Sequence, residues 1–183
     1  MIEIKIPKVE LFDEKKEEFI TIPETTLQLE HSLISLSKWE QKWHKPFLGM
    51  NEKKTKEEMF DYIRCMTLTK DVDPIVYQFI SPKILNEIFD YIEDPMTATW
   101  FNNENQKKTG RKNRVVTNEL IYCWMVMLGI PVQFEEWHLN RLMTLIRVIN
   151  AENTPAKKMS KKEIQAQNAR INAARRAKYK TKG

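Results

Sequence analysis

The chain has 183 residues, 30 of them Lys or Arg and 25 Asp or Glu, which gives a formal net charge of +5. Hydrophobic residues make up 42% of the chain. This length and composition fit one compact domain with an appendage and exclude a wholly disordered chain. They also exclude a membrane-spanning helix, because no stretch approaches the roughly 18 consecutive apolar residues that such a helix needs.

Residues 1–30 show the two-residue alternation that is typical of β-strands. Ile2, Ile4 and Ile6 alternate with charged residues, and apolar residues continue the pattern on both sides of the polar turn at 13–16. Prolines interrupt the alternation at two places, as they do at the ends of strands. We therefore expect a small antiparallel β meander in residues 1–30, with one face packed on the rest of the domain.

From Ser32 onward the apolar residues recur at steps of three and four, which predicts helices. The clearest amphipathic helix is expected over 82–93, and a helix over roughly 134–150 is apolar on more than half of its circumference. A polar run at 102–114 is expected to be a surface loop. Polar capping residues, some followed by proline, mark four of the expected helix starts: Thr55, Asp73, Ser81 and Thr117.

The charge is concentrated at the C-terminal end. Residues 156–183 contain ten basic residues and one acidic residue, a net charge of +9, so residues 1–155, with 20 basic and 24 acidic residues, have a net charge of −4. A capping box from Ser160 to Glu163 predicts a helix that ends near residue 178. We expect a basic helical or flexible tail over 156–183, whose candidate anion-binding residues are Lys157, Lys158, Lys161, Lys162, Arg170, Arg175, Arg176 and Lys178.

No pattern in the sequence is typical of a catalytic or metal site. The three histidines His31, His44 and His138 lie far apart in the sequence, and a metal or acid–base site would need ligands that converge. With only four glycines, the sequence has no glycine-rich segment that could form a phosphate-binding loop. We therefore expect no enzyme activity, no metal and no cofactor. The two cysteines, Cys65 and Cys123, lie in apolar helical patterns and are expected to be buried thiols of a cytosolic protein.

Several aromatic and methionine side chains at helical spacing are candidates for a partner-binding surface. Packing in the core is the more common use of such side chains. The alternative is a hydrophobic pocket for a partner helix. The candidate partner-binding residues are Trp39, Trp43, Phe47, Trp137 and Met143.

The basic tail suggests a different class of partner. Ten cations could bind DNA or RNA through the release of counterions. The tail has no interleaved aromatic residues, no helix-turn-helix signature and no zinc module that would indicate base reading. Docking onto an acidic protein surface, or a tail that is simply solvated, are the other interpretations.

Several segments resemble a family of small proteins from the tail-gene modules of phages and prophages, the tail assembly chaperones. The segments are Leu29-Glu30-His31-Ser32-Leu33 with Ser37-Lys38-Trp39-Glu40, Pro95-Met96-Thr97-Ala98-Thr99-Trp100-Phe101, Glu136-Trp137-His138-Leu139-Asn140-Arg141-Leu142, and Lys157-Lys158-Met159-Ser160-Lys161-Lys162-Glu163-Ile164. The resemblance implies a largely helical, non-enzymatic protein of the host cytoplasm. Such chaperones coat the helical, aggregation-prone tape-measure protein until tail-tube subunits displace them.

Together these observations predict an α+β, predominantly α-helical fold with a compact domain at 1–155, in which 31–155 is helical. The expected function is to bind and solubilise a helical structural protein during tail assembly, either as a monomer or as a homo-oligomer. Two alternatives stay open: a nucleic-acid-binding accessory protein that acts through the basic tail, and a structural component of the virion.

Overall fold

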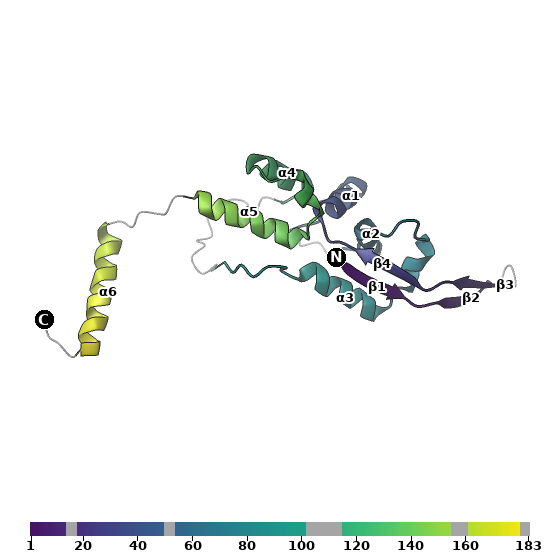
Figure 1. Cartoon of the computed structure of the whole chain (residues 1–183), viewed down its shortest axis with the longest axis horizontal. Coiled ribbons are helices and arrows are strands. Elements are labelled where there is room, and N and C mark those ends of the chain that lie inside the picture. The colour runs from purple at the N-terminus through teal and green to yellow at the C-terminus, as the bar shows by residue number, and fades with distance from the viewer. Residues whose placement is uncertain (14–17, 50–53, 102–114, 155–160, 180–183) are drawn as a thin grey trace. The chain divides into compact units, whose positions relative to one another are not determined.

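The computed structural model describes residues 1–13, 18–49, 54–101, 115–154 and 161–179 (Figure 1). The chain divides into two compact units, Met1–Ile149 and Asn150–Gly183. The first unit combines antiparallel strands with helices, and the second contains one long helix, so the predicted α+β, mostly helical fold is confirmed. The elements in chain order are β1 (Ile2–Ile6), β2 (Val9–Asp13), β3 (Glu18–Ile22), β4 (Thr25–Leu29), α1 (Leu33–Trp43), α2 (Lys56–Met66), the 3₁₀ helix η1 (Pro74–Phe79), α3 (Pro82–Glu93), α4 (Asn118–Met127), the 3₁₀ helix η3 (Val132–Glu136), α5 (Leu139–Asn153) and α6 (Lys161–Tyr179).

The N-terminal strands form a two-stranded ribbon instead of the predicted meander. β1 pairs with β4 and β2 pairs with β3, both antiparallel, whereas a meander would pair β1 with β2. The two pairs follow one another along the same ribbon and are separated at Pro7 and Pro23. Proline has no backbone N–H to donate, which explains why the ladder is interrupted there. The alternating pattern predicted the strands correctly, but it did not determine their partners.

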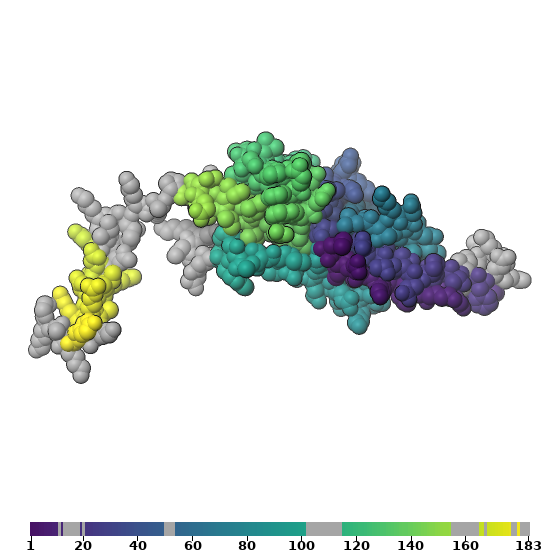
Figure 2. Space-filling view, viewed as in Figure 1, coloured from purple at the N-terminus to yellow at the C-terminus, as the bar shows by residue number. Residues whose placement is uncertain are grey.

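The part of the ribbon nearer the helices packs on the core, as predicted. Ile4, Ile6, Leu27 and Leu29 are buried together with apolar residues of α1 and α2. The β2–β3 end extends away from the helices (Figures 1 and 2). There the cross-strand pair Phe12–Phe19 is exposed, with ring centroids 5.1 Å apart. The ribbon therefore has one buried end and one end with apolar side chains in solvent.

Polar side chains cap three of the four helices at the predicted residues, whereas Thr117 precedes α4 but makes no side-chain capping hydrogen bond. At α2, the Thr55 hydroxyl accepts a hydrogen bond from the Glu58 N–H, and the Glu58 carboxylate accepts one from the Thr55 N–H, at 3.2 and 2.8 Å. This arrangement is a complete capping box. Asp73 and Ser81 cap η1 and α3 through a single hydrogen bond each, in which the side chain accepts from the N–H of Ile75 and of Ile84, and each is followed by a proline.

Replacing Thr55 with alanine is expected to lower the free energy of unfolding by about 1 kcal/mol, because an N–H in the first turn of α2 loses its acceptor. Urea unfolding followed by circular dichroism would measure the change. Thr117→Ala is the matched control, since Thr117 also precedes a helix but its hydroxyl makes no capping hydrogen bond. An equal loss of stability in the two variants would contradict the prediction.

The helix predicted over 134–150 begins later than expected. Residues 132–136 form η3 and α5 starts only at Leu139, so Trp137 lies outside the helix. The cause is a tertiary contact: Ser32 and His138 form an isolated antiparallel β-bridge, and the Leu139 N–H donates to the His31 carbonyl at 2.7 Å. A backbone N–H that is bonded to another segment cannot extend a helix across this point.

Two other expectations have mixed outcomes. Cys123 is exposed and Cys65 is partly exposed, so the prediction of two buried thiols is wrong. α6 ends at Tyr179, close to the predicted end. Ser160, its predicted cap, and the run at 102–114 lie outside the described residues.

Among the residues that are described, no helix combines the length and apolar character needed to cross a membrane.

Candidate protein-binding site

The junction of α1 and α2 contains three of the five candidate partner-binding residues. Trp39 is 1% exposed, and its indole Nε1–H donates to the Glu58 carbonyl at 2.8 Å. Phe47 is also buried, and its ring stacks on Tyr62 with centroids 3.9 Å apart. Trp39 and Phe47 therefore belong to the hydrophobic core in this fold, and neither side chain offers a surface to a partner.

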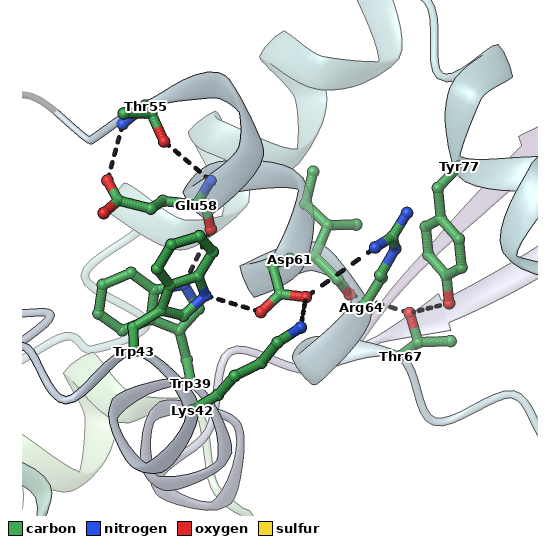
Figure 3. A network of polar contacts seen from close by, with 10 residues as sticks. Trp39, Lys42, Trp43, Thr55, Glu58, Asp61, Arg64, Thr67 and Tyr77 are labelled. Carbon is green, nitrogen blue, oxygen red and sulfur yellow. Dashed lines mark hydrogen bonds and ion pairs between the residues drawn. The ribbon is translucent and has the colours of Figure 1, made fainter.

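Trp43 is the aromatic residue of this group that reaches the surface. It lies one helical turn after Trp39, and the two indoles stack with centroids 6.1 Å apart. Its Nε1–H donates to the Asp61 carboxylate at 2.8 Å, so one edge of the ring is fixed to α2 (Figure 3). The buried Trp39 and this hydrogen bond hold Trp43 in a defined orientation at the edge of the core.

A hollow of about 600 Å³ lies beside Trp43, between α1, α2 and η1. Trp43, Phe60 and Tyr77 contribute aromatic surface to it. The remaining lining residues are polar or charged: Lys42, Lys56, Glu57, Asp61, Arg64 and Gln78. Volumes of this order are typical of binding sites, whose apolar walls supply affinity and whose polar groups supply specificity.

Asp61 organises the charges at this hollow. Its side chain is 7% exposed and accepts hydrogen bonds from the Lys42 ammonium and the Trp43 indole, with the Arg64 guanidinium 4.0 Å away (Figure 3). The lining contains three cations (Lys42, Lys56 and Arg64) and two carboxylates (Glu57 and Asp61), a balance of +1. Because Asp61 is already bonded within the protein, the exposed rim favours a ligand that carries negative charge beside an apolar group.

The other two candidate residues lie elsewhere in the fold. Trp137 is partly buried and stacks on Phe134 with centroids 4.0 Å apart, while the Arg141 guanidinium lies 3.9 Å from the Trp137 ring centre. Met143 of α5 is half-buried against the core. Neither residue lines the Trp43 hollow.

The structure also exposes apolar side chains that the sequence did not single out. On α4, Val126 and Met127 are 81% and 76% exposed and share a side of the helix with the exposed Cys123. A signal for this surface is present in the sequence, because Glu119 is the only charged residue between 118 and 134. A helix that is apolar all round in a small domain leaves part of its surface without a buried partner.

The fold brings His31 and His138 together inside the protein, although they are distant in sequence. Both side chains are buried, and their rings lie 5.0 Å apart. His138 donates from Nε2–H to the Tyr91 carbonyl at 3.0 Å and accepts at Nδ1 from the Asn140 N–H, so it is held in its neutral form. His31 shares a 2.6 Å hydrogen bond with the Tyr62 hydroxyl.

Burial determines the titration of this histidine pair. Loss of solvation, together with the neighbouring His138, lowers the pKa of His31 to about 3. Burial also lowers the pKa of His138, although the hydrogen bond to Tyr91 and the charge of Glu30 act in the opposite direction. The third histidine, His44, is exposed at the end of α1. Within the described ranges, no group of three or more His, Cys, Asp or Glu side chains is placed to hold a metal ion.

The cations predicted in the tail lie partly on α6. Arg170, Arg175 and Arg176 are exposed on this helix, which also includes Lys161, Lys162 and Lys178. Lys157 and Lys158 lie outside the described residues. The structure thus offers two kinds of candidate surface, the aromatic hollow at Trp43 and the cationic helix α6.

Comparisons of the chain with protein-family models, curated proteins and solved structures found no match.

Proposed function

We propose that this chain is a non-enzymatic phage tail assembly chaperone that binds the helical tape-measure protein in the host cytoplasm. The observation that carries the proposal is the hollow at Trp43, which combines aromatic walls with a charged rim. The similarity of several sequence segments to tail assembly chaperones supplies the class of client. The hollow supplies a physical means of binding it.

The chemistry of the hollow suits an amphipathic helix. Such a helix presents apolar side chains at steps of three and four residues, and one of them can insert between Trp43 and Phe60. Acidic residues beside that anchor would pair with Lys56 and Arg64 on the rim. Covering the apolar stripe of the client would prevent its aggregation. Because the hollow accepts only a small part of the client, each contact is weak, and tail-tube subunits can displace the chaperone.

Co-expression with the tape-measure protein of the same phage or prophage tests this function directly. We expect the tape-measure protein to be soluble and to co-purify with this chain, and to precipitate when it is expressed alone. A tape-measure protein that stays insoluble in the presence of this chain would contradict the proposal. Detection of the chain in mature particles at a fixed copy number would instead indicate a structural virion component.

Filling the hollow tests whether it is the binding site. Gln78 is exposed on the rim, so Gln78→Trp adds an indole there and leaves the contacts of Trp43 and Asp61 in place. We expect client affinity to fall by at least about tenfold, or roughly 1.4 kcal/mol. Titration of a tape-measure helix peptide, followed by calorimetry, would measure the change.

Gln133→Trp is the matched control, because it introduces the same side chain at an exposed glutamine of η3 outside the hollow. Thermal unfolding of both variants should match that of the parent protein. Equal client affinity in the two variants would show that the hollow is not the binding site.

A further inference from the structure

One face of α6 carries amide and guanidinium groups at helical spacing. Gln165, Asn168, Asn172 and Arg176 follow one another at steps of three, four and four residues, and Arg175 lies beside them. At 3.6 residues per turn these five residues fall within an arc of about 100°. All five are exposed. We refer to them as the amide stripe.

The residues around the amide stripe have either small or positively charged side chains. Ala169 and Ala173 lie next to it on the helix surface, and both are exposed. Arg170 projects from a position roughly 140° away from Gln165, so cations are not confined to one side. Residues 161–179 contain six basic residues and one acidic residue, a net charge of +5. The helix therefore fits a polyanion that contacts it from more than one direction.

We propose that α6 binds double-stranded DNA in the major groove, with the amide stripe toward the base edges. An α-helix with its side chains is about 10–12 Å wide, and the major groove of B-DNA is about 12 Å wide. Asn and Gln side chains can form paired hydrogen bonds with adenine N6 and N7. Arg175 and Arg176 lie at the two edges of the amide stripe, so they face the phosphates that border the groove while the amides between them face the bases. The positive charge of α6 thus favours a polyanion as the partner, and the amides favour the major groove, where they can pair with the base edges.

The same features argue against other anionic partners. An anionic membrane binds helices with a continuous apolar face, whereas Ile164 and Ile171 are the only large aliphatic residues of α6. Double-stranded RNA has a major groove too deep and narrow for side chains to read. An acidic protein surface would pair with the cations but would not require three amides on one face. This proposal goes beyond the chaperone function and does not depend on it, because the Trp43 hollow lies in residues 1–149.

The first test measures the electrostatic contribution with the full-length protein. Fluorescence anisotropy would follow binding to a random-sequence 20-base-pair DNA duplex between 50 and 200 mM NaCl. The variant Arg170→Gln/Arg175→Gln/Arg176→Gln should reduce the slope of log affinity against log salt by about 2, because Arg175 and Arg176 each lose a phosphate contact that contributes roughly 0.9.

The matched control is Lys5→Gln/Lys70→Gln/Lys83→Gln, which removes the same charge from three exposed lysines of residues 1–149. It should leave most of the salt slope in place. The same reduction in both variants would overturn the proposal. Tighter binding to an RNA duplex of the same sequence, or to vesicles with 30% anionic lipid, would overturn the choice of DNA.

The second test measures base reading by selection from a pool of random duplexes. The full-length protein should enrich duplexes that share an adenine-containing core. Gln165→Ala/Asn168→Ala/Asn172→Ala keeps every charge and favours the helix, so its affinity for unselected DNA should stay within about twofold. It should no longer enrich that core. No enrichment by the parent protein, or the same enrichment by this variant, would overturn base reading by the amide stripe.

Discussion

Lowering the pH from 7 to 5 is expected to reduce the free energy of unfolding by about 2 kcal/mol through His31 alone. The ordinary pKa of a histidine is 6.5, and burial lowers that of His31 to about 3. Between these two values the unfolded chain binds a proton that the folded chain does not. The unfolded state is therefore favoured as the pH falls through 6.5, and the loss continues until the folded form is protonated near pH 3.

His138 acts in the same direction, because its pKa is also lowered in the folded protein. A proton on either ring would place a positive charge on one of two buried imidazoles whose centres are 5.0 Å apart. A proton on His138 would also put a hydrogen on its Nδ1, which now accepts from the Asn140 N–H. Burying this charge is costly in free energy, and the nearby Glu30 offsets only part of the cost at His138. The histidine pair thus stabilises the fold only while it is neutral.

Urea unfolding at pH 7, 6 and 5 would measure this effect above the range in which most carboxylates titrate. His31→Asn should reduce the dependence on pH, because an amide near the Tyr62 hydroxyl cannot gain a proton in this range. His44→Asn is the control: His44 is exposed and has a left-handed backbone conformation that asparagine tolerates. Equal stability of the parent protein at pH 7 and pH 5 would contradict the prediction.

Replacing Glu40 with alanine is expected to lower the free energy of unfolding by roughly 3–5 kcal/mol, because it breaks a buried network that joins three segments. One carboxylate oxygen accepts from the Phe47 N–H at 2.7 Å. The other accepts from the backbone N–H and the side-chain amide of Asn118, both at 2.7 Å. The side chain of Glu40 is buried, so the three donors would be left without an acceptor or exposed to water.

The position of Glu40 at the start of α4 adds to this effect. Thr117 makes no side-chain cap, so the Glu40 carboxylate supplies both the acceptor and the negative charge that a helix N-terminus favours. Hydrogen exchange at the amides of Phe47 and Asn118 should therefore accelerate in the variant before the rest of the protein unfolds. Gln41→Ala, at the exposed neighbouring position of α1, should change stability by less than about 0.5 kcal/mol. A loss below 1 kcal/mol in Glu40→Ala would contradict the role of this network.

The candidate site could be predicted only in part. Helical spacing correctly indicated that Trp39 and Trp43 form one stripe, and the resemblance to tail assembly chaperones led us to propose that an apolar surface binds a partner. The spacing could not show that Trp39 faces the core while Trp43 lines a hollow with Phe60 and Tyr77. That difference depends on where α2 and η1 pack against α1. The exposed side of α4 was missed for the same reason, since an apolar helix gives no sign of which side lacks a neighbour.

The sequence by itself determined the local structure: the strand alternation in residues 1–30, the capping box at Thr55, the span of α3, and the division into an acidic body and a basic tail. These features depend on residues within a few positions of one another. Only the tertiary structure decided that β1 pairs with β4 and that Glu40 caps α4. It also decided that His138 contacts His31, and that the β-bridge between Ser32 and His138 makes α5 begin only at Leu139. Each of these contacts joins residues 19 or more positions apart, and their partners are selected by the packing of the whole core, which no local pattern encodes.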